Sequence, residues 1–123
     1  MNAVTFMLIL TGVLLNAAAQ LLLKAGTNVV GTISLVPGQM LAMFTSVALQ
    51  PFILAGLACY VFSVGIWIAA LSRVDVSIAY PMLSIGYVVN AVAAWYLFGE
   101  SLTASRLLGI AVIILGVVII SRS

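Results

Sequence analysis

From Phe52 to Leu71 the chain reads FILAGLACYVFSVGIWIAAL, without one charged residue. About 20 apolar residues, each rising 1.5 Å, span the roughly 30 Å hydrocarbon core of a bilayer. Inside lipid every backbone polar group needs a partner within the protein, so a run of this kind must form a helix. The stretch therefore predicts a membrane-spanning helix, and the rest of the chain repeats the pattern.

Three further runs, Ala3–Leu23, Val76–Phe98 and Leu107–Ile120, are also free of charge. All charged residues of the 123-residue chain lie at or beyond the ends of the runs, and they are Lys24, Arg73, Asp75, Glu100, Arg106 and Arg122. We expect an all-α membrane protein with one four-helix transmembrane domain over residues 1–123. Its helices are expected at about 3–24, 51–72, 76–98 and 103–121. Tight links join the last three helices and force these neighbours antiparallel.

The overall composition agrees with a membrane protein and excludes several functions. Apolar residues make up 66% of the chain and charged residues 5%, well outside the range of soluble domains. The net charge of +2 is spread along the chain, so no nucleic-acid partner is expected. No nucleophile–base constellation, cofactor motif or metal-ligand cluster is present, and we expect neither an enzyme nor a bound cofactor or metal.

The segment from residue 25 to residue 50 is the only long connection. Glycine and proline punctuate it, at Gly26, Gly31, Pro37 and Gly38, and predict that the first helix ends before it. Apolar residues then recur at helical spacing, at Met40, Met43, Phe44 and Val47. This pattern predicts a short amphipathic helix at the membrane interface between helices one and two. Met1–Val4 lacks Lys and Arg, and we expect the first run to be a retained helix rather than a cleaved signal.

Polar residues within the runs are the candidate substrate-binding positions. Asn16, Gln20 and Lys24 follow one another at i, i+4 and share one face of the first helix. The later helices contribute Tyr60 and Ser63, and Tyr80 and Ser84. These groups must face protein or water, and they suit either a substrate-lining seam or hydrogen bonds between helices. Lys24 suits either a substrate contact or a snorkelling anchor at a helix end.

Two pairs of residues predict a hinge and an assembly surface. Pro81 removes a helix hydrogen bond and Gly86 follows closely, so a bend or hinge is expected between them. Gly109 and Gly116 are seven residues apart and share one face of the last helix. Small residues in register let backbones approach, which predicts a dimer seam at this face, against a second copy or a paralogue.

The stretch Ile78-Ala-Tyr-Pro-Met-Leu-Ser84, with Phe98-Gly-Glu100 and the glycine pair, resembles the drug/metabolite transporter superfamily. Its four-helix members are the small multidrug resistance proteins and the EamA-like subunits of the undecaprenyl phosphate-aminoarabinose flippase. The drug exporters carry a membrane glutamate in helix one where this chain has Asn16, and a tryptophan where it has Leu83. The flippase branch instead shows Gln followed four residues later by Lys, as Gln20 and Lys24 do here.

The resemblance implies a multi-pass flippase subunit of the bacterial inner membrane. Its expected substrate is a polyprenyl-phosphate-linked sugar, such as an undecaprenyl phosphate derivative, or a similar anionic membrane lipid. The phosphate-binding cation would be Lys24 or Arg73, whereas Glu100, at a helix end, is expected to matter for loop structure more than for transport. A transporter of small metabolites or drugs, and a non-transporting membrane partner subunit, remain the alternatives. Two basic residues fall on each side of the membrane, so the charge count favours N-in and C-in only weakly.

Overall fold

A computed structural model describes residues 2–123 as helices joined by short turns and one longer connection. The helices are α1 (Ala3–Val30), η1 (Pro37–Gln39), α2 (Met40–Ala48), α3 (Pro51–Leu71), α4 (Val76–Met82), α5 (Ser84–Phe98) and α6 (Ala104–Ser121). Within the described residues, α1, α3, the α4–α5 pair and α6 are each long and apolar enough to cross a membrane. The predicted fold class, four spanning helices with a shorter helix between the first two, is confirmed.

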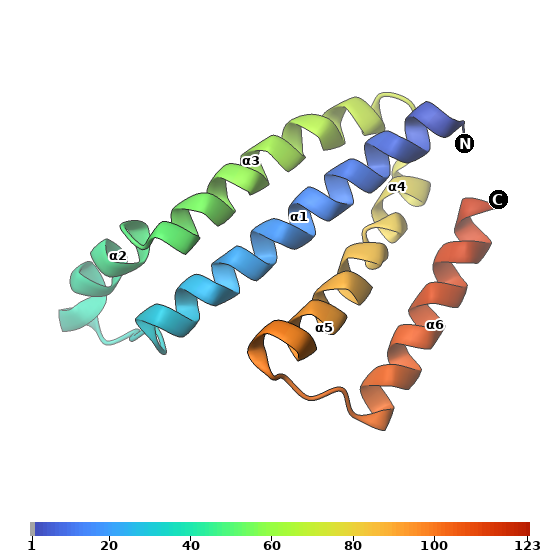
Figure 1. The fold of residues 1–123 in the computed structure, drawn as a ribbon. Coiled ribbons are helices and arrows are strands. Elements are labelled where there is room, and N and C mark those ends of the chain that lie inside the picture. The colour runs from blue at the N-terminus through green and yellow to red at the C-terminus, as the bar shows by residue number, and fades with distance from the viewer. Residues whose placement is uncertain (1) are drawn as a thin grey trace.

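The four spans lie side by side in the order α3, α1, α4–α5 and α6 (Figure 1). Helix α3 runs antiparallel to α1 and makes the most extensive contact with it, while α5 packs on another side of α1. Helix α6 contacts α4 and α5 and lies at the outside of the bundle. Both chain ends therefore lie at one end of the bundle, where Arg73 and Arg122 also lie. Lys24 and Arg106 lie towards the other end.

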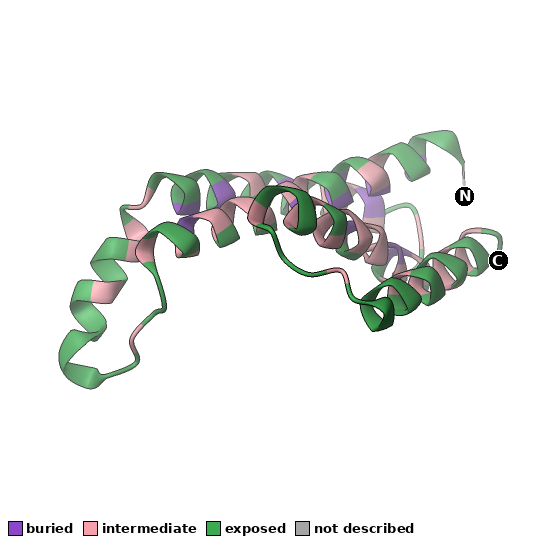
Figure 2. Ribbon diagram, turned by 60° about the horizontal axis from the view of Figure 1, so that its bottom comes forward, coloured by how far each residue is buried: buried purple, intermediate pink, exposed green. Residues whose placement is uncertain are grey.

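A small apolar core holds the spans together near the chain termini. Ile9 and Val13 of α1 are fully buried against Ala70 of α3 and Met82 of α4. Figure 2 shows the buried residues gathered where α1 meets its neighbours, whereas α6 carries no buried residue. Many apolar side chains of the spans, such as Phe62 and Leu108, face outwards, as expected of helices whose solvent is lipid.

Polar side chains cap the N-terminal ends of three of the spans by accepting hydrogen bonds from free backbone N–H groups. Asn2 Oδ1 accepts from Thr5 N at 2.8 Å, and Thr103 Oγ1 accepts from Arg106 N at 3.2 Å. Gln50 does the same for α3, and Pro51 follows it in the first turn, where no N–H is needed. The start of each of these spans is thus encoded locally.

Helix α1 is longer than the sequence indicates, because Gly26 does not end it. The expected end was near residue 24, yet α1 continues to Val30 and stops at Gly31, whose φ of 89° belongs to the left-handed region. Gly26 is buried against the start of α3, and a Cβ at this position would overlap Ile53. The glycine therefore serves close helix packing, and Lys24 lies inside α1 rather than at its end.

The third span is interrupted at Leu83, between α4 and α5. Pro81 lies inside α4, and the chain passes the break with tighter bonds, from Leu83 N to Tyr80 O at 3.0 Å and from Gly86 N to Leu83 O at 2.9 Å. Gly86 is buried, and a Cβ there would approach Val13 Cγ1 to 3.3 Å. A break thus lies between Pro81 and Gly86, and a hinge motion at this break stays a prediction.

Helix α2 projects past the ends of α1 and α3 (Figures 1 and 2). None of its residues is buried, and its apolar side chains Leu41 and Phe44 are among the most exposed of the protein. The connection between α1 and α3, residues 31–50, contains no charged residue. These features favour the predicted position at the membrane interface, which stays a prediction.

Candidate functional site

The polar face of α1 borders two separate hollows. The first, called the central cavity, measures about 260 Å³ and lies among α1, α3 and α4. Its polar and aromatic lining consists of Asn16, Tyr60, Ser63, Trp67 and Tyr80. The second, called the end groove, measures about 760 Å³ and lies between α1 and α5. The single polar seam expected from the sequence is thus divided into two parts.

The indole of Trp67, which lines the central cavity, contains a hydrogen-bond donor that is unpaired within the described residues. Its Nε1 is buried and has no hydrogen-bond partner within residues 2–123. Gly12 makes room for the indole, because a Cβ at Gly12 would lie 3.4 Å from Trp67 Cε3. A buried N–H without an acceptor costs free energy, on the order of 1–3 kcal/mol.

A hydrogen bond joins Ser63 to Tyr60, three residues earlier on α3. Ser63 is 3% exposed, and its Oγ donates a hydrogen bond to the Tyr60 carbonyl oxygen at 2.7 Å. The hydroxyl proton is therefore engaged within the helix, and Ser63 retains only the ability to accept. Tyr60 is 43% exposed. Between these two residues, Tyr60 offers the freer polar group to a ligand.

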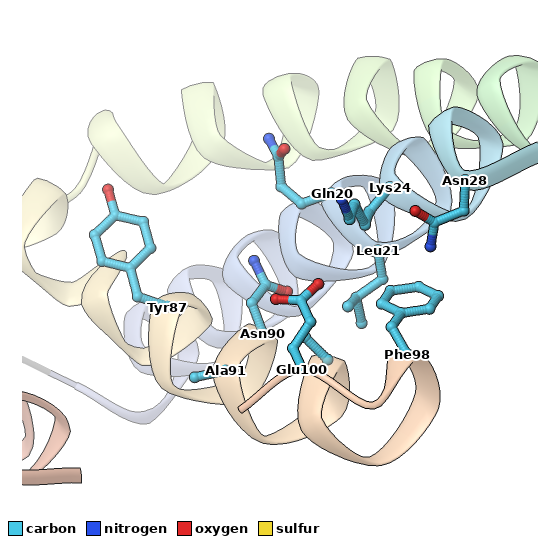
Figure 3. Close-up of a pocket in the computed structure, with 10 residues that line it drawn as sticks. Gln20, Leu21, Lys24, Asn28, Tyr87, Asn90, Ala91, Phe98 and Glu100 are labelled. Carbon is cyan, nitrogen blue, oxygen red and sulfur yellow. The ribbon is translucent and has the colours of Figure 1, made fainter. Parts of the chain in front are cut away.

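Amide, charged and aromatic side chains line the end groove (Figure 3). They are Gln20, Lys24 and Asn28 from α1, Tyr87, Asn90 and Phe98 from α5, and Glu100 from the turn after α5, with Leu21, Ala91 and Ala94 between them. Asn90 Oδ1 is buried and has no hydrogen-bond partner within residues 2–123. The groove thus combines one cation, one carboxylate and three amides, a donor and acceptor set that suits a polar headgroup.

The structure groups the predicted site residues unevenly. It places Asn16, Tyr60, Ser63 and Tyr80 around the central cavity, and Gln20 and Lys24 along the end groove. Ser84 lines neither of these hollows. The role of all seven residues in substrate binding stays a prediction.

Arg73, the second candidate for a phosphate-binding cation, lies far from both hollows. It lines a smaller hollow of about 270 Å³ near the chain termini, with Asp75 among the other lining residues. Lys24 is therefore the cation that the fold brings together with the amide side chains of α1.

The predicted site does not include four polar residues that line the end groove: Asn28, Tyr87, Asn90 and Glu100. Asn28 follows Lys24 by four residues and continues the polar face of α1, but the helix was expected to end before it. Asn90 lies on the third span, as Tyr80 and Ser84 do, but outside the predicted site. The position of Glu100 beyond the helix end predicts a role in loop structure instead.

The glycine-marked face of α6 is uncovered in the single chain. A Cβ at Gly109 or at Gly116 would meet no atom within 4 Å. Neither glycine is therefore needed for contacts inside the chain, which is compatible with the predicted dimer seam. The seam itself stays a prediction.

Comparison with known proteins supplies the family. Residues 3–122 match the EamA-like transporter family. The chain is 37% identical to the probable 4-amino-4-deoxy-L-arabinose-phosphoundecaprenol flippase subunit ArnF of Shewanella sediminis, over 93% of this chain and 85% of the relative. The identity is 36% to the protein of the same name in Aeromonas hydrophila, over 94% of this chain and 78% of the relative.

Other comparisons add little about function. The uncharacterized protein y4nH of Sinorhizobium fredii is 31% identical over 99% of this chain. No solved structure matches the chain. The four helical spans and the bacterial relatives place the chain in the bacterial inner membrane as a multi-pass protein. With nearly its whole length matched, the chain belongs to the EamA-like transporter family.

Proposed function

We propose that this chain is a subunit of a flippase that moves a polyprenyl-phosphate-linked sugar, or a similar anionic lipid, across the bacterial inner membrane. The observation that carries the proposal is the end groove, where Lys24 lies beside the amides Gln20 and Asn28 on one face of α1. An ammonium with neighbouring amide donors suits a phosphate and the hydroxyl groups of a sugar. The names of the ArnF relatives support the same substrate class.

The chemistry of the spans favours a lipid headgroup over proton-coupled export of cations. Asn16 occupies the middle of α1, and both acidic residues, Asp75 and Glu100, lie outside the spanning helices. A protein that exchanges protons for cations needs an ionisable group within the membrane. A flippase for a lipid phosphate needs instead a polar path for the headgroup, while the polyprenyl tail stays in lipid. We expect no catalysed reaction.

A second chain is expected to complete the path. The end groove is an open hollow on the surface of the single chain, and α6 presents its glycine-marked face without a partner. A partner of similar size, either a second copy or a paralogue, would cover such surfaces and enclose the headgroup. The relatives named as flippase subunits support an assembly of this kind.

The central cavity favours a second candidate function, the transport of a small soluble solute. Its volume of about 260 Å³ and its aromatic walls suit a small molecule without a lipid tail. The lipid proposal takes precedence because the end groove is larger and contains the only basic residue among the lining residues of the two hollows.

Binding of a polyprenyl phosphate, compared with the uncharged polyprenol, tests the proposal. The purified protein in lipid nanodiscs is expected to bind the phosphate at least about tenfold more tightly, the scale of a charge-assisted hydrogen bond. Equal affinity for the phosphate and the alcohol would contradict recognition of a lipid phosphate.

A further inference from the structure

The end groove holds one cation and one carboxylate, which come from its two different walls. Lys24 belongs to α1, and Glu100 belongs to the turn after α5 (Figure 3). Both residues are exposed, and both line the same hollow of about 760 Å³. Opposite charges on two walls of one groove attract each other, whereas a carboxylate repels a phosphate. Glu100 therefore does not serve the binding of a phosphate headgroup directly.

Lys24 is the single cation that the groove offers to Glu100. It is the only lysine of the chain and the only basic residue that lines the groove. Arg106, the other basic residue towards this end of the bundle, donates from Nη1 to the Ser101 carbonyl oxygen at 2.6 Å. This bond holds the guanidinium group at the link between α5 and α6. The carboxylate is thus left with the ammonium on α1 as its partner.

The fold fixes the backbone at both positions and leaves the two side chains room to move. Gly99 ends α5 in the left-handed region with a φ of 68°, and Glu100 N donates to the Ala94 carbonyl oxygen at 3.3 Å. Lys24 lies inside α1, before the end of this helix at Val30. A lysine side chain is flexible and carries a compact charge at its end. The two charged groups can therefore approach or separate by rotation of exposed side chains.

We propose that Lys24 and Glu100 form an ion pair that closes the empty end groove, and that an anionic headgroup opens the groove by replacing the carboxylate at Lys24. The identity of the headgroup rests on the proposed function, whereas the pair itself does not. A carboxylate and a phosphate both offer charged oxygen acceptors to an ammonium. Glu100 is thus an internal competitor for the phosphate-binding cation. A neutral lipid offers Lys24 no charge and leaves the pair closed.

The pair is expected to have a modest effect on affinity. Both groups are exposed, and solvent weakens ion pairs of this kind. A ligand that binds only the open groove must first separate the pair, which lowers its apparent affinity. Removal of the competing carboxylate is therefore expected to strengthen binding of a polyprenyl phosphate about two- to fivefold, the scale of an exposed ion pair. The inference revises the expectation that Glu100 matters for loop structure more than for transport.

Zero-length cross-linking with a water-soluble carbodiimide tests the pair directly. The reagent joins an amine to a carboxylate as an amide only where the two groups touch. Lys24 is the only lysine and Asp75 the only other acidic residue, so peptide mapping by mass spectrometry identifies the product. The full chain in phosphatidylcholine nanodiscs, with the reagent in excess, is expected to form the Lys24–Glu100 amide within a single chain. Polyprenyl phosphate is expected to suppress this amide, while polyprenol and inorganic phosphate at the same concentration leave it in place.

Variants measure what the pair does to binding of a polyprenyl phosphate. Glu100→Gln is expected to strengthen this binding about two- to fivefold, and Glu100→Asp keeps the charge and is expected to stay nearer to wild type. In a Lys24→Gln background, Glu100→Gln is expected to have no further effect, whereas simple repulsion by Glu100 would persist there. Asp75→Asn, at the other end of the bundle, is the matched control and is expected to change neither binding nor the cross-link. Circular dichroism checks that each variant keeps its helix content.

The outcomes distinguish this inference from the proposed function. Absence of the Lys24–Glu100 amide from the empty wild-type protein would overturn the pair and leave the flippase proposal intact. An amide that persists when polyprenyl phosphate saturates the protein would overturn displacement by the headgroup. Suppression by inorganic phosphate as strong as that by the lipid would overturn the link to a lipid. A polyprenyl phosphate bound no better than polyprenol would contradict the proposed function, while the amide in the empty groove would still support the pair.

Discussion

The indole of Trp67 and the phenol ring of Tyr80 meet edge to face, with ring centroids 5.5 Å apart and planes at 83°. This arrangement is a favourable one for aromatic pairs, and here it joins α3 to α4 at the wall of the central cavity. It holds the Trp67 ring in place while its Nε1 remains without an acceptor. The pair therefore positions a hydrogen-bond donor beside the third span, just before the break at Leu83.

Trp67→Phe tests whether this donor contacts the substrate. The substitution keeps an aromatic ring beside Tyr80 and removes the N–H group together with part of the indole. If the headgroup passes through the central cavity, affinity for the sugar lipid is expected to fall by about 0.5–1.5 kcal/mol, the range of one neutral hydrogen bond. Trp95→Phe, on the exposed side of α5, is the matched control and is expected to be silent. Identical binding by both variants would exclude Trp67 from the substrate path.

Substitutions at Lys24 separate a phosphate contact from an anchor. If Lys24 contacts the phosphate, Lys24→Gln is expected to weaken binding of a polyprenyl phosphate by about 1.5–3 kcal/mol. Lys24→Arg is then expected to retain part of that binding energy. Arg73→Gln, at the other end of the bundle, is the control and is expected to leave binding unchanged. A silent Lys24→Gln variant would return Lys24 to the role of a snorkelling anchor.

Gly116→Leu tests the assembly surface on α6. A larger side chain has free space in the single chain, so the monomer is expected to fold normally. Backbone approach between two α6 helices would be obstructed, and the dimer fraction on detergent size-exclusion chromatography is expected to fall. Gly65→Leu on α3, where a Cβ also meets no atom within 4 Å, is the matched control. Wild-type protein that stays monomeric at every concentration and crosslinks to no partner would remove the seam.

Gly26→Ala tests the packing of α1 on α3. The added methyl group would overlap Ile53 and approach Gln50 Oε1. This oxygen caps the N-terminal end of α3. Overpacking of this kind is expected to destabilise the protein by about 1–3 kcal/mol in thermal unfolding. Gly109→Ala, in open space on α6, is expected to be neutral or stabilising by up to about 1 kcal/mol, because alanine favours helix. Equal stability of the two variants would show that the contact at Gly26 carries no strain.

The sequence predicts the membrane-spanning helices, but it does not predict which residues line the end groove. Charge-free runs such as Phe52–Leu71 predict helices reliably, since lipid leaves the backbone no other way to pair its polar groups. A glycine that ends a helix and a glycine that admits a neighbouring helix look alike in sequence. Gly26 therefore predicts a helix end that the structure does not have, and the predicted polar face of α1 stops before Asn28. Glu100 joins Lys24 only through the packing of α5 on α1, a relationship that helical spacing along one segment does not contain.

Translocation by protein reconstituted in liposomes, together with any subunit that co-purifies with it, tests the central claim most directly. A fluorescent polyprenyl-phosphate-linked sugar is placed in one leaflet, and soluble sugars and cationic dyes are tested in parallel. The account predicts that the lipid crosses faster than in protein-free liposomes, that Lys24→Gln slows this crossing, and that the soluble solutes stay outside. Uptake of a soluble solute without movement of the lipid would contradict the account and favour a small-solute transporter, and movement of neither would favour a non-transporting partner subunit.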